Sequence, residues 1–323
     1  MTAPLRGAGL RRRVILLTEF SLGGLPEGGK SQSLRPPAPN RLLKNSRPDN
    51  PHSAADKLDE KALIVGYAAA VQMWKPRSDE MSDQKTVVVL GVGEVKGLGA
   101  AVAMRFARAG YTAVVAGRTQ SQLDKVVGAI QKAGGEADAV VTDASSEDSI
   151  VTLVAAAEKT GPIEVAVYNA GGNSPQTSLA TTGKHFETSW KVGAFGGFVF
   201  GRETIKAMLP RSQGTLLFTG ASASLRGRPG FVSFAAAKAA LRAVSQAFAR
   251  EFGPKGIHVA HVVIDGAISG HRIHSLVPDF AKAKGEDGLL NLEAIAENYW
   301  QLHQQHKTTW SQEIDLRPFK ESF

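Results

Sequence analysis

The stretch Thr86-Val-Val-Val-Leu90-Gly91-Val-Gly93-Glu-Val-Lys96-Gly97-Leu98-Gly99 decides the fold of this chain. It begins with five apolar or β-branched residues and continues into a loop with four glycines, after which an amphipathic helix pattern runs to about residue 109. Glycines in such a loop let backbone N–H groups approach a pyrophosphate at a helix N-terminus, where a Cβ would intrude. The stretch therefore predicts a nucleotide site; the alternative is a glycine-rich loop without function.

Short apolar runs alternate with helical patterns beyond this stretch. We expect strands at 86–90, 112–116, 137–141, 163–168, 214–218 and 258–263, each nearly continuous in apolar residues, as parallel strands covered on both faces are. Thr119 and Gln122 predict a capping box on one helix, and Ser145 is expected to open the next. The alternation predicts an α/β fold, a Rossmann-type doubly wound parallel sheet in a single domain over 81–323.

Composition limits the classes of partner. The 323 residues include no cysteine, which excludes disulfides and thiolate metal sites. The net charge is +8, but residues 1–80 carry 13 Lys and Arg against 8 Asp and Glu, so the predicted domain is only weakly basic. We therefore expect no nucleic-acid partner, and we expect no membrane partner because no apolar run is long enough to span a bilayer.

Residues 1–80 read as a basic, largely disordered N-terminal extension, because Gly and Pro interrupt every periodic pattern in it. Three consecutive arginines at 11–13 and few acidic residues are typical of an organelle transit peptide. Met81 precedes the first strand by five residues, which equally allows a misassigned start. We expect a cytoplasmic protein, with a mitochondrial or plastid location as the alternative if the extension is a transit peptide.

The end of the second strand indicates which nicotinamide cofactor fits. An acidic residue there would hold the ribose hydroxyls of NAD, whereas Gly117-Arg118 offers a cation that accommodates the 2′-phosphate of NADP. Lys96 adds a second positive charge to the same region. These residues predict that NADP(H) is preferred over NAD(H); the alternative is that both cations are ordinary surface charges.

Over about residues 84–318 the chain resembles the short-chain dehydrogenase/reductase family. Its Gly-x-x-x-Gly-x-Gly turn is matched by Gly93, Gly97 and Gly99, with Gly91 as an additional glycine and Val92 where Thr is usual. The resemblance implies further cofactor contacts. They are the adenine-contacting acid Asp143, the family's Asn-Ala-Gly at Asn169, Ala170 and Gly171, and the nicotinamide loop at Asp265, Gly266, Ala267 and Ile268. Asn169 reads equally well as a structural tie within the sheet.

The catalytic positions depart from the family pattern. The family uses Asn, Ser, Tyr and Lys: Tyr is the general acid, Lys lowers the pKa of Tyr and grips the nicotinamide ribose, and Ser orients the carbonyl. Here the Tyr-x-x-x-Lys motif reads Phe234-Ala-Ala-Ala-Lys238. Ser222, with Ser224 as a competitor, stands near the Ser position, and Gly193 stands where Asn is expected. The resemblance thus assigns Ser222, Phe234 and Lys238 to the catalytic positions without a general acid.

Three hypotheses of function remain. The first is an NADP(H)-dependent oxidoreductase with an altered tetrad, acting on a small-molecule carbonyl or alcohol. The second is a non-catalytic NADP(H)-binding homologue that acts as a sensor or assembly subunit. The third is a nucleotide binder without a redox role, against which the pairing of Arg118 with Lys238 argues. A substitute proton donor for the first reading could be a bound water or one of the side chains of Ser222, Ser233, Tyr168 and His185.

The remaining features concern assembly, substrate and metal. The resemblance implies a homodimer or homotetramer through the helices around Gly196 and Phe234. The helix from Asn291 resembles the family's substrate-covering helix, and the loops 174–184 and 269–279 are expected to decide the substrate. His303 and His306 lack a third ligand, so no metal site is expected.

Overall fold

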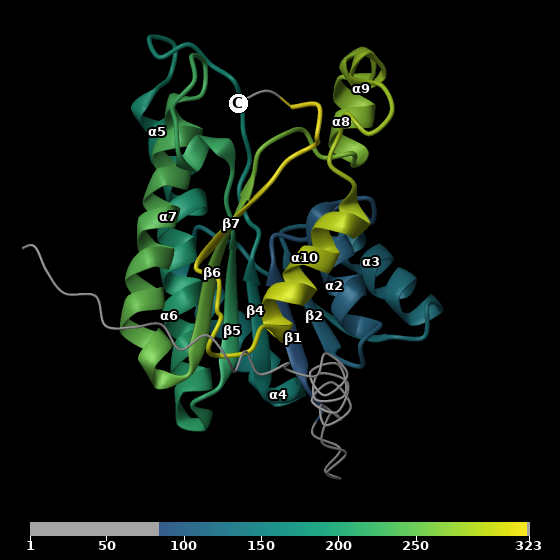
Figure 1. The fold of residues 1–323 in the computed structure, drawn as a ribbon, viewed down its shortest axis with the longest axis vertical. Coiled ribbons are helices and arrows are strands. Elements are labelled where there is room, and N and C mark those ends of the chain that lie inside the picture. Colours follow the sequence, from purple (N-terminus) through teal and green to yellow (C-terminus); the bar gives the residue numbers. More distant parts are fainter. Residues whose placement is uncertain (1–83, 322–323) are drawn as a thin grey trace, which may run out of the picture. The chain divides into compact units, whose positions relative to one another are not determined.

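The computed structural model describes residues 84–321, which form one sheet of seven strands (Figure 1). All neighbouring strands are parallel, and their order is β3-β2-β1-β4-β5-β6-β7. The strand order reverses between β1 and β4, as in a doubly wound Rossmann-type sheet. The predicted fold is confirmed, and the predicted extension over 1–80 lies outside the described residues. The strands are β1 (Thr86–Leu90), β2 (Thr112–Gly117), β3 (Glu136–Val141), β4 (Ile163–Tyr168), β5 (Gly214–Thr219), β6 (Ile257–Ile264) and β7 (Glu313–Leu316).

Helices cover both faces of the sheet (Figure 1). One face carries α2, α3 and α10, and the other carries α4, α6 and α7. The helices are α2 (Leu98–Ala107), α3 (Gln120–Lys132), α4 (Glu147–Thr160), α5 (Gly183–Trp190), α6 (Gly196–Met208), α7 (Val232–Phe252), α8 (His271–Leu276), α9 (Pro278–Lys284) and α10 (Leu292–Gln304). Short turns are the π-helical η1 (Lys191–Phe195) and the 3₁₀ turns η2 (Leu209–Arg211), η3 (Ser222–Ser224) and η4 (Gly253–Lys255).

The apolar runs of the sequence form the strands because both faces of the sheet are buried. Every residue of β1, β2, β5 and β6 is buried, whereas in the edge strand β3 only Ala137 is buried and the other residues are exposed or half-buried. Each expected strand agrees with the observed one to within one residue at either end. The two core clusters lie on opposite faces of the sheet, so the site described below is held by packing on both sides.

Two predictions about helix caps were wrong. Thr119 is the N-cap of α3, but its side chain makes no cap bond, and Gln122 does not complete a capping box because its side-chain amide donates to Glu94 at 2.9 Å. Helix α4 is capped by Ser146, not opened by Ser145. The Ser145 hydroxyl donates to the Asp143 carboxylate at 2.8 Å, so Ser145 does not cap the helix.

Helix α6, which contains three glycines, packs closely against α7. A Cβ on Gly197 would lie 2.3 Å from Leu241 of α7, and one on Gly201 would lie 2.5 Å from Phe248 of the same helix. These glycines therefore allow α6 to approach α7 and do not contact the cavity described below.

Candidate active site

A cavity of about 560 Å³ opens at the carboxyl ends of the strands, above the point between β1 and β4 where the strand order reverses. This is where open α/β sheets bind ligands. Most of the predicted site residues meet there. They are Gly91, Gly93, Lys96, Gly97, Leu98, Gly99, Asn169, Gly171, Ser222, Phe234, Lys238, Gly266 and Ile268.

The glycine turn forms one wall of the cavity. Gly91 has a φ of 108° and a Cβ there would lie 2.3 Å from the Ala170 backbone nitrogen, so both conformation and space require glycine. A Cβ on Gly93 would meet nothing within 4 Å, because this residue faces the cavity. The protein itself does not need a glycine at 93, whereas a ligand lying against the backbone would.

The start of α2 is suited to an anion. Gly97 is its N-cap, no side chain caps the helix, and its first turn contains no acidic residue. The first N–H groups of a helix have no partner within it, and the helix dipole favours negative charge there. Because Gly97 and Leu98 line the cavity, these donors are available to a phosphate inside it.

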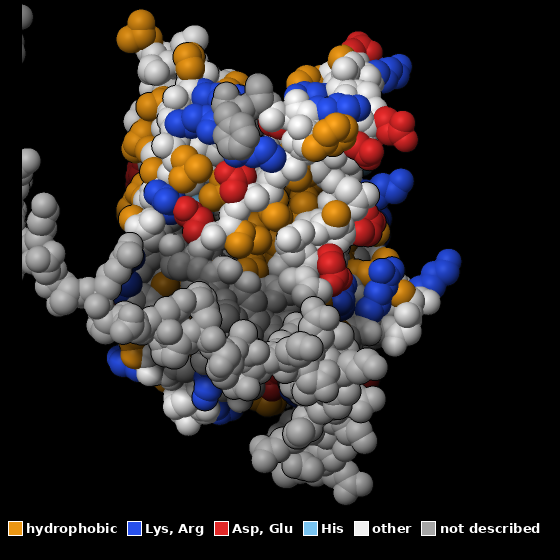
Figure 2. Space-filling view, in the orientation of Figure 1, with side chains coloured by type: hydrophobic (Ala, Val, Ile, Leu, Met, Phe, Trp, Pro, Cys, Tyr) orange, Lys and Arg blue, Asp and Glu red, His pale blue; other side chains and the backbone are white. Residues whose placement is uncertain are grey.

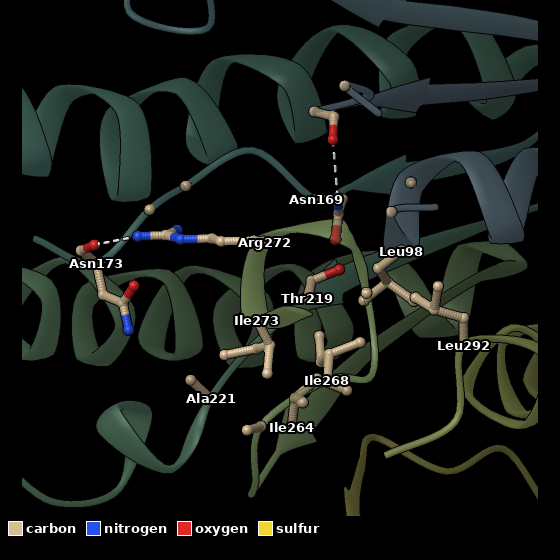
Figure 3. A pocket seen from close by; sticks show the side chains of 18 of the residues that line it. Leu98, Asn169, Asn173, Thr219, Ala221, Ile264, Ile268, Arg272, Ile273 and Leu292 are labelled. Carbon is tan, nitrogen blue, oxygen red and sulfur yellow. Dashed lines mark hydrogen bonds between the residues drawn. The ribbon is translucent and has the colours of Figure 1, made fainter. Parts of the chain in front are cut away.

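Asn169 ties the ends of two strands together. Its Nδ2 donates to the Gly91 carbonyl at 2.9 Å (Figure 3), and its backbone N–H donates to the Leu90 carbonyl at 2.8 Å. The structural reading of this residue is therefore correct, although the residue also lines the cavity. Its neighbour Ala170 is buried and lies behind the wall of the cavity.

Lys238 projects from α7 into the cavity as a buried cation. Its Nζ donates to the Thr219 carbonyl at 2.6 Å, and no carboxylate of the described residues lies within salt-bridge distance. Burial lowers the pKa of Lys238 to about 8. An ammonium group has three donors, so two remain for a ligand. Nζ lies 5.9 Å from the centre of the Phe234 ring.

The structure distinguishes the two candidate serines. Ser224 is buried, and its Oγ accepts a hydrogen bond from the Ala221 backbone at 3.2 Å. Ser222 lines the cavity together with Phe234 and Lys238. Only Ser222 can therefore present its hydroxyl to a ligand.

The other candidate proton donors lie outside the cavity, which no tyrosine lines among the described residues. Tyr168 is fully buried and donates its hydroxyl to the Val192 carbonyl, and burial raises its pKa. His185 lies on α5 and Ser233 is buried in α7, and neither lines the cavity.

Gly193 lies away from the cavity as well. A Cβ on Gly193 would lie 2.7 Å from the Ala237 Cβ, so this position packs against α7. An asparagine at 193 would need α7 to move.

Arg118 and Asp143 lie outside the cavity wall, both exposed, at the ends of β2 and β3. Asp143 accepts hydrogen bonds from the Ser145 backbone at 2.9 Å and hydroxyl at 2.8 Å. These bonds, together with the nearby charge of Arg118, lower the pKa of Asp143. The two predicted adenosine-side residues are thus close enough to interact.

Residues of α8 that no motif indicated complete the cavity. Arg272 reaches across it and donates to the Asn173 carbonyl (Figure 3), and the His271 backbone donates to the Lys96 carbonyl at 2.8 Å. Both lie in the loop 269–279 that the sequence associates with the substrate. The expectation for the helix from Asn291 was wrong, because α10 packs against α2 and only its first residue, Leu292, lines the cavity.

No group of three His, Cys, Asp or Glu side chains within residues 84–321 is arranged to hold a metal ion. None of the helices described combines the length and the hydropathy that a membrane crossing requires.

Residues 85–272 match the family model described as short chain dehydrogenase. This chain belongs to that family. The glycine turn, the Asn169 tie and the segment from Phe234 to Lys238 all fall within the matched range.

Similar proteins are oxidoreductases. A 3beta-hydroxysteroid dehydrogenase of Mediterraneibacter gnavus is 33% identical over 178 residues, which are 54% of this chain and 63% of the relative. The match thus spans just under two thirds of that relative's length. A short-chain dehydrogenase from Rhodopseudomonas palustris has 38% identity and a TM-score of 0.63, over 76% of this chain and all of the other. A variant of the actinorhodin polyketide ketoreductase, solved with NADPH, shares the fold at 22% identity and a TM-score of 0.67, over 74% and 98% of the two chains.

Proposed function

We propose that the chain is an NADP(H)-dependent oxidoreductase acting on a carbonyl or alcohol, with Phe234 at the position of the family's catalytic tyrosine. The observation that carries the proposal is Lys238, a buried cation with free donors beside Phe234 and Ser222 in the cavity. Such a cation is costly to bury and needs acceptors, which ribose hydroxyls supply. The relatives are oxidoreductases of the same class.

The residues that line the cavity have separate proposed roles in binding the cofactor and the substrate. A nicotinamide cofactor, when bound, supplies or accepts the hydride. The glycine turn and the first turn of α2 would hold its phosphates, and Lys238 would bind the ribose. Ser222 would orient the substrate oxygen by a hydrogen bond. Phe234 has no proton to donate. The site therefore relies on the positioning of the substrate and on a proton from the Ser222 hydroxyl or from water.

Arg118 is proposed to select the cofactor. It is exposed at the end of β2, where Gly117 leaves no carboxylate to repel a 2′-phosphate. The Arg118→Ala variant is expected to weaken NADPH binding about tenfold while NADH binding stays within about twofold, because only NADPH carries the phosphate. Fluorescence titration with both cofactors measures this, and Lys125→Ala on α3 is a control for a lost surface charge. Equal affinity of the native protein for the two cofactors would refute the preference.

A measurement of turnover distinguishes the catalytic hypothesis from the non-catalytic one. No tyrosine of the described residues lines the cavity, which favours the second candidate, a cofactor-binding sensor or assembly subunit. Native protein should be assayed for NADPH oxidation with a panel of ketones that includes a 3-ketosteroid, suggested by the steroid dehydrogenase relative. Turnover that is lost in Lys238→Ala supports the oxidoreductase. NADPH binding without turnover on any substrate would favour the sensor.

We further propose that copies of the chain associate through α5, α6 and α7. Hydrophobic side chains gather along the edge of the molecule where Figure 1 places α5 and α7 (Figure 2). The exposed ones include Phe186, Trp190, Phe198 and Val232. Exposed aromatic patches of this kind mark contact surfaces. Sedimentation of the native protein tests whether it forms a dimer or a tetramer.

A further inference from the structure

The backbone segment that leads from β5 into the active site packs against a buried histidine, His261. His261, in the middle of β6, is 0% exposed, and His258 is the only other polar residue of this buried strand. A Cβ on Gly220 would lie 2.3 Å from the His261 ring, so the backbone between Thr219 and Ala221 rests directly on the imidazole. Thr219 provides the carbonyl that binds Lys238, and Ala221 precedes Ser222.

A chain of hydrogen bonds passes through this ring. The Ala221 N–H donates to Ser224 Oγ at 3.2 Å, and Ser224 Oγ lies 3.4 Å from His261 Nε2. On the other side of the ring, Nδ1 lies 2.9 Å from Glu313 Oε2 of β7. Arg242 of α7 holds that carboxylate with two bonds of 2.6 and 2.7 Å. The relay thus joins α7 and β7 to the η3 turn.

The protonation states fix the direction of each bond. A hydrogen bond from Arg242 lowers the pKa of Glu313, so Glu313 is a carboxylate that only accepts. Burial lowers the pKa of His261 to about 4, so the ring is neutral and its one proton lies on Nδ1, toward Glu313. Nε2 is then an acceptor for the Ser224 hydroxyl, whose oxygen accepts from Ala221. Every donor in the relay has an acceptor.

The order Ser224, His261, Glu313 resembles that of a nucleophilic triad, but the geometry excludes this use. Ser224 is 5% exposed, does not line the cavity, and uses its oxygen as the acceptor for a backbone N–H. A nucleophile must be able to reach a substrate. The relay therefore acts on the protein and not on a ligand.

A second tie fixes the same turn from its other end. Arg226, just after η3, lies 3.3 Å from both carboxylate oxygens of Asp265, and Asp265 immediately precedes Gly266 of the cavity. The turn is thus anchored both before and after Ser222. Asp265 is 2% exposed and also pairs with Arg317 at 3.1 Å.

We propose that His261 is a positioning residue: held by Glu313, it fixes the η3 turn through Ser224 and so places the Ser222 hydroxyl and the Thr219 carbonyl beside Lys238. The proposal rests on the proposed function for its catalytic consequence, since Ser222 and Lys238 act there. The fixing of the turn itself does not depend on that function.

Isosteric variants separate the two sides of the ring. The amide of Asn in His261→Asn takes the place of Nδ1 and keeps the bond to Glu313, but leaves Ser224 without its acceptor. In His261→Gln the amide reaches the place of Nε2 and restores that acceptor. Ser224→Ala removes the same link from the other partner. His258→Asn is the matched control, because His258 is 2% exposed in the same strand but stacks on Trp310 at the end far from the cavity.

Amide hydrogen exchange over 219–226 is the deciding measurement. We expect exchange about tenfold faster in His261→Asn and Ser224→Ala, the effect of losing one hydrogen bond, with partial return in His261→Gln and no change in His258→Asn. Unchanged exchange in His261→Asn, or an equal increase in His258→Asn, would overturn the proposal.

Kinetics then test the catalytic consequence. If the native protein turns over a substrate, His261→Asn should lower kcat about 10- to 100-fold and leave KM for NADPH unchanged. A small displacement of a reacting group reduces the rate of the reaction more than it reduces binding. A higher KM for NADPH with an unchanged kcat would contradict a positioning role for His261. Native protein without turnover contradicts the proposed function alone, and the exchange comparison then decides the role of His261.

Discussion

Phe234→Tyr should reduce ketones with NADPH about 10²- to 10⁴-fold faster than native protein, the usual contribution of a positioned general acid. The new phenol would stand where the cavity already holds Ser222 and Lys238. Nζ of Lys238 lies 5.9 Å from the ring centre, close enough for the cation to favour the phenolate and lower the pKa of the phenol. Steady-state NADPH oxidation across a panel of ketones measures the gain.

Two variants control this experiment. Phe231→Tyr adds a phenol three residues earlier, outside the cavity lining, and should leave turnover unchanged. Lys238→Ala in the Phe234→Tyr background should remove most of the gain. Robust native turnover that falls on introducing Tyr would show that the site uses another donor around an apolar Phe234, and the description of a tetrad without its acid would be wrong.

The missing asparagine limits the gain and is not easily restored. Gly193 packs against Ala237 with only 2.7 Å for a Cβ, and Ala237 precedes Lys238 in α7. Introducing Asn at 193 would therefore displace the helix that carries the lysine. This contact explains why the glycine at 193 suits the present packing of α7.

The fold could be predicted because its signals are local. Buried parallel strands appear as apolar runs, and the glycine turn lies between the first strand and its helix, so each of the six expected strands lies within one residue of an observed strand. The cap predictions failed where another hydrogen-bond partner was available: Gln122 bonds Glu94, which lies 28 positions away, and Ser145 bonds Asp143, which lies 2 positions away. Cap motifs are short, and one competing hydrogen bond is enough to override them.

The site residues that belong to a sequence motif were predicted, and those without a motif were not. The glycines, Ser222 and Lys238 meet in the cavity because their motif fixes the element on which each lies. Arg272 has no motif and depends on how α8 folds over the cavity. The relay through His261 joins residues on four separate elements, and the sequence shows two histidines in an apolar strand without indicating which of them has these partners.

Acidification should destabilise the protein well before its carboxylates titrate. Burial lowers the pKa of His261 to about 4, and that of His303 likewise to about 4. A histidine whose pKa is depressed in the folded state contributes its full stability above its unfolded pKa of about 6.5 and loses it as the pH falls through the folded value. Each ring can account for about 3 kcal/mol, so the free energy of unfolding should fall steeply between pH 6.5 and 4.

Urea unfolding at fixed ionic strength from pH 7.5 to 4.5 measures this slope. His303→Gln provides the test of cause, because His303 bonds Tyr111 at 2.7 Å and Thr215 at 2.9 Å and its loss costs stability at neutral pH. The same variant removes one titrating group, so its free energy of unfolding should decline less steeply with acid than that of native protein. A free energy that stays constant from pH 7 to 5, or a slope unaltered in His303→Gln, would mean that these rings accept protons in the folded state without cost.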